Sequence, residues 1–400
     1  MFILRILLCA TIFTLFLYSC NNTNESKESD STDSIIPITI ITEIGLADQP
    51  PEHLLGQPIA VRSDKEGNIY IADRASLTVK VFDEQGIYLR SFGGRGRGPG
   101  EFQQINFMEL TDEGSLYFLD RGKLEHIYLT TQGEFITSYP IIIETNILQY
   151  YPHKVFWYED RTIGIRRSGA QPTVDSPPLD RPLFHIYSRD FQEGYESFFP
   201  FRELGYTEEE HFIWNSFGWL PGDFDMSSDN RRFIYSPGVY NGSLYEFALQ
   251  NGQWKVERTL QGTPPLNGPY DIYTSDEVYF RNEGIPGVNR IYYSGGPFMG
   301  RLYSIDAGIY YLNDGRIVHF FGEWRGGDTT LEEGNSLDIS VQIFDPKGIV
   351  LTQGHITSLK MDQRPSYTIV NWKDNQDNFY LLNLPKEEIP TVIKFRLPIL

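Results

Sequence analysis

The chain has 400 residues, with 53 acidic and 34 basic side chains, a formal net charge of −19 and two cysteines. Nucleic acids are bound mainly through lysine and arginine contacts, so a surface this acidic excludes a nucleic-acid partner. The length is sufficient for a sizeable core that needs no disulfide.

Residues 1–19 are typical of a bacterial secretory signal. Arg5 precedes an apolar run at residues 6–18, which is too short to span a bilayer comfortably. The letters L-Y-S-C at residues 17–20 resemble a lipobox, in which Cys20 becomes the lipidated first residue, although Tyr18 is larger than usual there. The alternatives are an ordinary signal peptide cut nearby and an uncleaved anchor. We expect attachment in the cell envelope, at the outer membrane, on a side that the sequence does not define.

Residues 20–36 comprise this cysteine and a polar segment, N-N-T-N-E-S-K-E-S-D-S-T-D-S-I-I. The segment has almost no large apolar side chain before Ile35, so it buries too little surface to offset the entropy of ordering. The sequence predicts a flexible tether. With Cys9 in the signal and Cys20 lipidated, the domain at residues 37–400 would contain no disulfide.

One pattern recurs six times after residue 63: a polar turn with Gly or Asn, two short strands, a second polar turn and a third strand. The strands are short, rich in aromatic and β-branched residues and bounded by turn residues, as antiparallel strands are. The copies lie at residues 64–93 and 112–139, and the later ones end at residues 199, 260, 354 and 397.

Four-stranded antiparallel units repeated around an axis form a β-propeller. Six copies favour six blades, with seven as the less favoured alternative. The sixth copy stops after its third strand and would leave an open edge. We predict that residues 38–44 supply its outer strand and close the ring, with Ile38 and Ile40 on one side and Ile41 and Ile44 on the other.

Three segments resemble an NHL repeat: G-N-I-Y-I-A-D at residues 67–73, V-K-V-F-D-E-Q-G at residues 79–86, and S-F-G-G-R-G-R-G-P-G-E-F at residues 91–102. The chain as a whole resembles the six-bladed β-propeller lipoproteins of bacteria. The likeness is strong over the first copy and good over the second, and it fades to the strand pattern alone from the third to the fifth. It implies the fold and says little of function, because most of these proteins have no assigned activity.

The glycine-rich residues 91–103 suggest a phosphate-binding loop at first sight. That motif requires Lys-Ser/Thr and a following helix, whereas a strand follows here. We interpret the stretch as the tight link between the first two blades, where glycines accommodate the backbone. Arg95 and Arg97 are not needed for such a turn and could contact an anion.

Loop lengths predict where a ligand binds. In an up-and-down blade, the first-to-second and third-to-fourth turns lie on one face, and all other links lie on the opposite face. The first class is uniformly short, whereas the second holds insertions at residues 168–181, 202–221, 262–301 and 323–337. Long loops inside a compact domain are usually functional, so we expect the second face to bind a glycan, a peptide or an envelope protein.

The candidate ligand-binding side chains are those whose type suits recognition, and the alternative is that the aromatic ones only pack the loops onto the blades. They are Arg95, Arg97, Trp214, Trp219, Tyr292, Trp324 and Arg325.

Signals of catalysis are weak, and we predict no catalytic residue, no bound metal and no cofactor. The seven histidines form no H-x-x-x-H pair, and neither a G-x-S-x-G motif nor a Ser-His-Asp constellation is recognisable. The alternative function is an NHL-like lyase or hydrolase with Ca²⁺ or Zn²⁺ in the centre of the ring. Its ligands would come from inner-strand carboxylates such as Glu109, Asp223 and Asp225.

Overall fold

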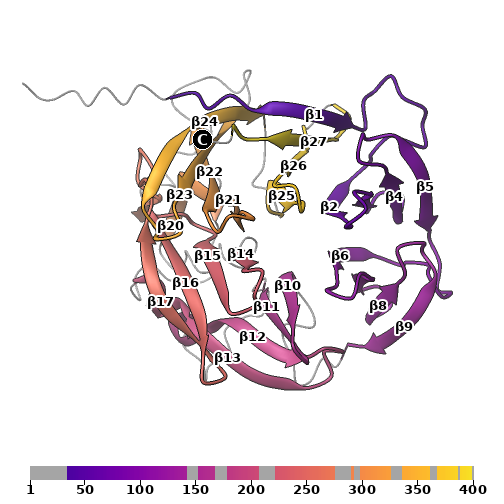
Figure 1. The fold of residues 1–400 in the computed structure, drawn as a ribbon, viewed down its shortest axis with the longest axis horizontal. Coiled ribbons are helices and arrows are strands. Elements are labelled where there is room, and N and C mark those ends of the chain that lie inside the picture. The colour runs from indigo at the N-terminus through magenta and orange to yellow at the C-terminus, as the bar shows by residue number, and fades with distance from the viewer. Residues whose placement is uncertain are drawn as a thin grey trace, which may run out of the picture. The chain divides into compact units, whose positions relative to one another are not determined.

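The computed structural model describes residues 34–141, 152–166, 178–206, 221–274, 290–291, 298–325, 336–360, 367–385 and 388–398. These residues form six four-stranded antiparallel sheets that follow one another around a ring, as Figure 1 shows. The predicted six-bladed β-propeller is confirmed. No helix in this part of the chain is long and apolar enough to cross a membrane.

The first three blades each take their strands in chain order. Blade 1 consists of β2 (Pro58–Ser63), β3 (Ile69–Asp73), β4 (Thr78–Phe82) and β5 (Tyr88–Gly93). Blade 2 consists of β6 (Ile105–Leu110), β7 (Leu116–Asp120), β8 (Glu125–Leu129) and β9 (Phe135–Pro140). Blade 3 consists of β10 (Pro152–Tyr158), β11 (Arg161–Arg166), β12 (Pro182–Ser188) and β13 (Gly194–Pro200).

The last three blades complete the ring. Blade 4 consists of β14 (Gly222–Met226), β15 (Arg232–Pro237), β16 (Ser243–Gln250) and β17 (Gln253–Gln261). Blade 5 consists of β21 (Ser304–Tyr311), β22 (Ile317–Arg325), β23 (Ser336–Phe344) and β24 (Val350–Lys360). Blade 6 consists of β25 (Val370–Lys373), β26 (Phe379–Asn383), β27 (Thr391–Arg396) and β1 (Thr39–Ile44).

The links contain little further regular structure. Two short 3-10 helices belong to blade 3 and its link: η2 (Pro178–Asp180) lies between β11 and β12, and η3 (Phe201–Leu204) follows β13. The long link between blades 4 and 5 contains a three-stranded sheet that the sequence did not predict. Its strands are β18 (Tyr270–Thr274), β19 (Arg290–Ile291) and β20 (Phe298–Leu302).

The N-terminal strand closes the ring as predicted. β1 pairs antiparallel with β27 as the outer strand of blade 6, and Ile44 is fully buried. The register shifts between Ile40 and Thr42, so Ile41 is an extra residue in a bulge. The simple alternation expected for the isoleucines is therefore interrupted, and both Ile40 and Ile41 are exposed.

Two residues before β1 also contact the propeller. Ile35 forms a parallel bridge with His355 in β24, and the Ile36 amide donates to the His355 carbonyl at 2.9 Å. The Ile36 side chain is buried in the cluster between blades 5 and 6. These two residues, which the sequence assigned to the end of the tether, attach the closing strand to a second blade.

The core consists of six hydrophobic clusters, each between two neighbouring blades. A middle strand is therefore covered on both sides, and β3 and β7 are buried at every position. Outer strands have one free side, so β5 alternates between half-buried and exposed residues. This difference explains why alternation in the sequence is clear only for outer strands.

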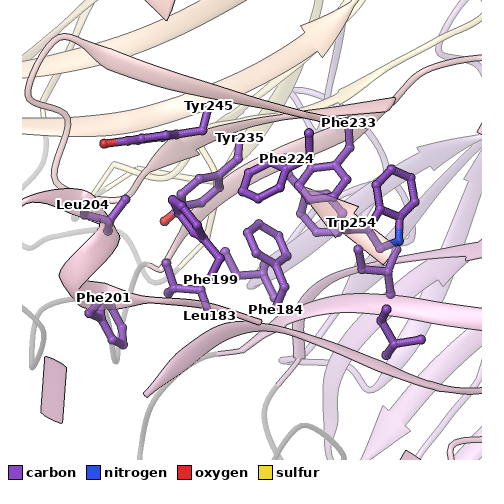
Figure 2. Packing of buried hydrophobic residues seen from close by; sticks show 14 of the residues in the cluster. Leu183, Phe184, Phe199, Phe201, Leu204, Phe224, Phe233, Tyr235, Tyr245 and Trp254 are labelled. Atoms are coloured by element: carbon purple, nitrogen blue, oxygen red, sulfur yellow. The ribbon is translucent and has the colours of Figure 1, made fainter. Parts of the chain in front are cut away.

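The cluster between blades 3 and 4 is the most aromatic of those described, and Figure 2 shows it. Phe233 stacks on Phe247 with ring centroids 4.4 Å apart, and Phe184 packs edge-on against Phe224 at 5.3 Å. Trp254 donates its indole N–H to the Tyr158 hydroxyl at 3.2 Å. The aromatic residues of this cluster are thus accounted for by packing.

Candidate functional site

The strand bounds separate the links into the two predicted classes. The described first-to-second and third-to-fourth turns are all short, as at residues 64–68 and 83–87. The other links include residues 94–104, 201–221, 262–303 and 326–335. We call the side with the short turns the short-turn face and the opposite side the long-loop face.

The glycine-rich link on the long-loop face is an ordered structural turn. The amides of Gly94 and Gly96 donate to the carbonyls of Leu77 and Phe102, at 2.8 and 3.0 Å. Gly98 N–H donates to the Glu101 carboxylate at 2.7 Å. A Cβ on Gly96 would lie 1.9 Å from that carboxylate, so a larger residue there would displace the Glu101 side chain. Because the loop uses these amides internally and a strand follows, it is not a phosphate cradle.

Arg95 and Arg97 lie in this link and are both exposed. Arg95 forms a backbone bridge with Phe102, and no ion pair holds either guanidinium among the described residues. Their place on the long-loop face agrees with a role in contacting a ligand.

The other candidate binding residues have different positions. Trp324 lies in β22, is 4% exposed and packs in the cluster between blades 5 and 6. Arg325 is the last residue of β22. Trp214, Trp219 and Tyr292 lie outside the described residues. Of the candidates whose side chains the structure describes, Arg95 and Arg97 are exposed and Trp324 is buried.

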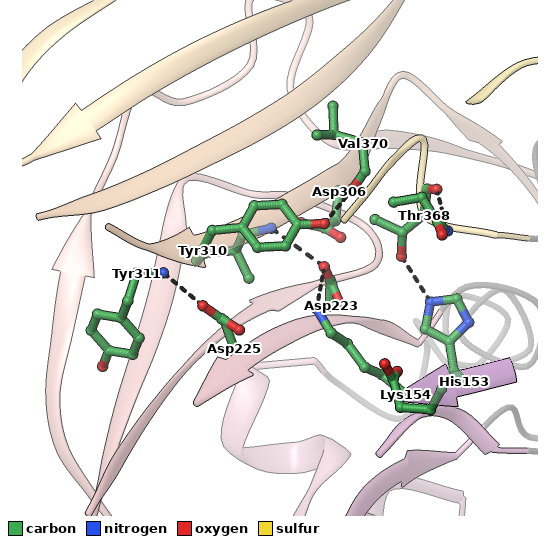
Figure 3. Close-up of polar contacts among 12 residues, drawn as sticks. His153, Lys154, Asp223, Asp225, Asp306, Tyr310, Tyr311, Thr368 and Val370 are labelled. Atoms are coloured by element: carbon green, nitrogen blue, oxygen red, sulfur yellow. Dashed lines mark hydrogen bonds and ion pairs between the residues drawn. The ribbon is translucent and has the colours of Figure 1, made fainter. Parts of the chain in front are cut away.

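The inner strands bring together a buried charged cluster that the sequence did not reveal. Arg62 of β2 pairs with Glu109 of β6, with Nη2 2.7 Å from Oε2. Lys154 of β10 pairs with Asp223 of β14, with Nζ 2.9 Å from Oδ1, as Figure 3 shows. All four side chains are at most 5% exposed.

These partners account for the carboxylates considered as metal ligands. Glu109 is held by Arg62, Asp223 is held by Lys154, and Asp225 accepts the Tyr311 amide at 2.8 Å. Among the described residues, no group of three or more Asp, Glu, His or Cys side chains is placed to hold a metal ion.

Two further carboxylates in the centre, those of Asp306 and Asp225, lie in surroundings that disfavour their ionised form. Burial, followed by repulsion from Asp223, raises the pKa of Asp306 well above its usual range. Burial also raises the pKa of Asp225, against the opposing effect of Lys154. The centre therefore holds more carboxylates than cations, and Lys154 is the cation that acts on all of them.

A serine, a histidine and an aspartate do come together behind the centre. His319 Nε2 is 2.9 Å from Ser236 Oγ and 3.2 Å from Asp306 Oδ1. In a nucleophilic triad the serine and the carboxylate bind opposite ring nitrogens, whereas here they share one. His319, Ser236 and Asp306 are at most 1% exposed. This group is a buried polar network and has no access to a substrate.

The other ring nitrogen of His319 faces Gln342. Gln342 Nε2 donates to the Tyr240 hydroxyl at 2.8 Å and contacts His319 Nδ1 at 2.7 Å, while its Oε1 accepts from the Thr263 amide. Because the amide nitrogen is the donor, His319 Nδ1 accepts and the ring proton lies on Nε2. The network links blades 4 and 5 through satisfied hydrogen bonds.

The buried histidines predict a loss of stability in acid. Burial lowers the pKa of His126 and of His319 to about 3, below the unfolded value. As the pH falls below about 6.5, these histidines are protonated in the unfolded chain but not in the folded one. Each of them therefore lowers the free energy of unfolding by about 1.4 kcal/mol per pH unit. Asp225 and Asp306 act in the opposite direction, since their raised pKa favours the folded state in acid.

A double variant isolates the contribution of His126 to this pH dependence. Tyr117→Phe with His126→Phe removes both partners of a 2.8 Å hydrogen bond, so neither is left unpaired. Urea unfolding of this variant between pH 7 and pH 4 should show a shallower loss of stability than the parent protein, by about 1.4 kcal/mol per unit. Parallel pH profiles would contradict the assignment.

One described pocket opens beside the charged cluster, and we call it the central pocket. Its lining includes Arg62, Arg74, Asn106, Lys154 and Tyr367, and its empty volume of about 500 Å³ includes open solvent. Most of the lining residues lie near the start of an inner strand, namely β2, β6, β10 or β14. The others lie in the link after β3, which holds Arg74, or at and just before β25, where Tyr367 precedes the strand. These ends belong to the long-loop face, so the pocket opens there.

Arg74 enters this pocket because of a turn that blades 1 and 2 share. Asp73 and Asp120 end the second strands of their blades and accept backbone amides from the link before the inner strand, at 2.7–3.1 Å. The next residue is an arginine in both, Arg74 and Arg121. The letters D-R-x-x-L occur in both blades, at residues 73–77 and 120–124, and are the sequence signal for this turn. Their repetition by itself does not indicate a function.

Comparison with known proteins supports the fold. Residues 46–199, which include nearly all of blades 1 to 3, match a family described as a 6-bladed beta-propeller. No curated protein matches the chain significantly.

Several solved structures are similar. A member of the duf4221 family from Bacteroides vulgatus has a TM-score of 0.55 at 9% identity, covering 92% of this chain and 100% of its own. A Bacteroides fragilis protein described with the words "exported protein" has a TM-score of 0.50 at 10% identity, covering 92% and 97%. Virginiamycin B lyase from Staphylococcus aureus has a TM-score of 0.43 at 12% identity, covering 90% and 100%. The first two show the shared fold, and the third carries no argument about activity.

Proposed function

We propose that the chain is a lipid-anchored, non-catalytic binding protein of the cell envelope that takes a ligand on its long-loop face. The observation that carries this proposal is the central pocket, which opens on the face that holds the long links. The short-turn face has compact hairpin turns, such as those around Gly67, Gly86 and Gly348, where positive φ angles suit glycine. The ligand would be a glycan, a peptide or an envelope protein.

The anchor follows from Cys20 and places the propeller beside a membrane. A lipobox cysteine receives more than one acyl chain, and two or more chains give stable attachment. We propose the outer membrane as the site. The tether would give the propeller freedom to turn its long-loop face toward a partner.

The first test of this proposal concerns anchoring. Cys20→Ser should move the protein from the membrane fraction to the soluble fraction without lowering its melting temperature, because Cys20 lies outside the propeller. Fractionation after a carbonate wash measures the change, and a Cys9→Ser variant serves as the control that should remain anchored. Retention of Cys20→Ser in washed membranes would exclude the lipobox.

The second test concerns the binding face. The double variant Arg95→Ala with Arg97→Ala should weaken capture of a partner from detergent-solubilised envelopes, because each lost contact of a guanidinium with an anion costs about 1.5–3 kcal/mol. Lys65→Ala with Lys347→Ala removes two exposed cations from the short-turn face and should change nothing. Trp324 is unsuitable for this test, since its burial makes Trp324→Ala a change in packing.

Quantitative mass spectrometry of the captured proteins and glycans gives the readout for both double variants. The reverse result, with capture lost only in the short-turn variant, would show that the ligand binds the other face.

A further inference from the structure

We infer that the central pocket binds the carboxylate group of a small ligand, with Arg74 as the residue that receives it. This inference deepens the proposed function, since it rests on binding at the long-loop face and names the chemical group that is recognised there. It is carried by three properties of the pocket lining: its charge, its free hydrogen-bond donors and the position of Arg74.

The charge of the lining leaves one positive charge without compensation. Arg62 is neutralised by Glu109, and Lys154 is neutralised by Asp223. Arg74 pairs with no carboxylate of the described residues. A single unpaired cation in a half-buried pocket of a strongly acidic protein attracts a monoanion.

The hydrogen bonds of the lining point to a ligand rich in acceptors. Arg74 uses only Nε, which donates to the Ile105 carbonyl at 3.2 Å, so both terminal nitrogens have no partner in the described structure. Asn106 uses its Oδ1 for the Arg121 amide, and no bond of its Nδ2 exists among the described residues. The same holds for the hydroxyl of Tyr367, the third side chain with a free donor.

The amide and carboxylate oxygens of the described lining, by contrast, have partners, and the Asp223 carboxylate is paired with Lys154. Asn371 Oδ1 accepts from the Val61 amide at 2.8 Å and from Arg62 Nη1 at 3.0 Å. The Thr368 hydroxyl pairs with His153 Nε2 at 3.1 Å, as Figure 3 shows. A pocket with free donors and occupied acceptors selects an anion over a hydrogen-bond donor such as an amine.

A carboxylate fits this arrangement better than a larger anion. The free ends of a guanidinium form a planar fork that matches the two oxygens of a carboxylate. Asn106 and Tyr367 line the same pocket and supply further donors. One compensating positive charge suits one negative charge, whereas a phosphate dianion would require another cation.

Arg74 has the features of a residue kept for binding. Burial, and then the charge of nearby Arg121, lowers the pKa of Arg74. Without a ligand, its guanidinium therefore loses hydration and faces a like charge, and it gains no ion pair with any residue that the structure describes. A buried cation beside a like charge lowers stability, and residues that lower stability in this way are typical of functional sites.

The test uses two pairs of probes that differ in the carboxylate. D-glucuronate is compared with D-glucose, and N-acetylalanine is compared with its primary amide, by ligand-observed NMR titration of the full chain. The acidic member of at least one pair should bind and its neutral counterpart should not. Binding of the sugar acid alone assigns the ligand to acidic glycans, and binding of the peptide acid alone assigns it to peptide termini.

Variants then locate the site. Arg74→Gln should weaken binding of the acidic probe by about 10- to 100-fold, the equivalent of one charged hydrogen-bonding contact. Arg74→Lys should also weaken it, because lysine keeps the charge and loses the fork. Arg316→Gln removes a cation that pairs with Asp314 on the short-turn face, and it should leave binding unchanged.

Stability provides a second readout. Unliganded Arg74→Gln should melt close to the temperature of the parent protein, since the arginine has no carboxylate partner among the described residues and loses only a 3.2 Å hydrogen bond to the Ile105 carbonyl. Equal binding of acidic and neutral probes, no binding of either acid, tighter binding of inorganic phosphate, or unchanged binding by Arg74→Gln would overturn the inference. A clear fall in melting temperature of that variant would assign Arg74 a structural role instead.

These outcomes are separable from those of the proposed function. A captured partner that depends on Arg95 and Arg97 and is insensitive to Arg74→Gln would refute the carboxylate site and keep the binding face. Loss of binding on Lys65→Ala with Lys347→Ala would refute the face itself.

Discussion

Deletion of residues 21–45 should unfold or aggregate the protein at temperatures where the intact propeller is stable, whereas deletion of residues 21–34 should leave its melting temperature nearly unchanged. The longer deletion removes β1 and therefore the outer strand of blade 6. Its neighbour β27 would then have an unpaired edge, which promotes aggregation.

The size of the effect follows from what β1 and its flanking residues bury. Ile44 is fully buried, and Ile36 is 7% exposed. Burial of one such side chain stabilises by about 1.5–3 kcal/mol, to which the ladder with β27 adds hydrogen bonds. The strand also reaches blade 1, where the Thr42 hydroxyl donates to the Gln85 carbonyl at 2.9 Å.

The segment therefore connects three blades, since Ile36 contacts blade 5 and β1 belongs to blade 6. Thermal unfolding and size-exclusion chromatography of the two truncations provide the measurement. The shorter deletion is the matched control, because it removes the polar tether alone. Equal stability of both forms would show that the ring does not depend on its closing strand.

Replacement of Lys154 by methionine should lower the free energy of unfolding by about 3–5 kcal/mol, although methionine has a similar length. Lys154 is the cation that pairs with Asp223, and its charge also lowers the pKa of Asp225 and of Asp306. Without it, Asp223 would be left as a buried charge with no cationic partner, beside two carboxylates whose raised pKa values already oppose ionisation.

Two comparisons separate this effect from a general loss of packing. Lys154→Met with Asp223→Asn removes both charges and should recover part of the loss. Arg316→Met breaks a pair with Asp314, whose carboxylate is 53% exposed, and should cost less than about 1 kcal/mol. Urea unfolding at constant pH provides the values. A loss of the same size for Lys154→Met and Arg316→Met would contradict a special role for the buried pair.

The pattern of short strands and turns was sufficient to predict the architecture. The turns carry Gly or Asn at positions that need positive φ, and each repeat contains too little surface to form a core alone, so repeats must stack. The truncated last repeat required an outer strand from elsewhere, and the isoleucine-rich residues 38–44 were the available partner. The bulge at Ile41 was not visible, because register depends on the partner strand.

The binding residues were harder to predict. An aromatic side chain in a long link has the same composition whether it packs or binds, and Trp324 proved to be a buried residue of β22. The NHL-like character and the lipid anchor stay predictions from sequence resemblance. The ligand likewise stays a proposal that rests on the pocket.

The sequence by itself thus determined the number of blades, the closing strand and the two classes of links, because these depend on local periodicity and turn chemistry. Only the tertiary structure decided which charges meet. Arg62 and Glu109 are 47 residues apart in the chain, and Lys154 and Asp223 are 69 apart. Their pairing arises because inner strands of neighbouring blades converge on one axis. Arg74 has no carboxylate partner in the described part of the chain for the same reason, since burial and partner geometry are properties of the assembled ring.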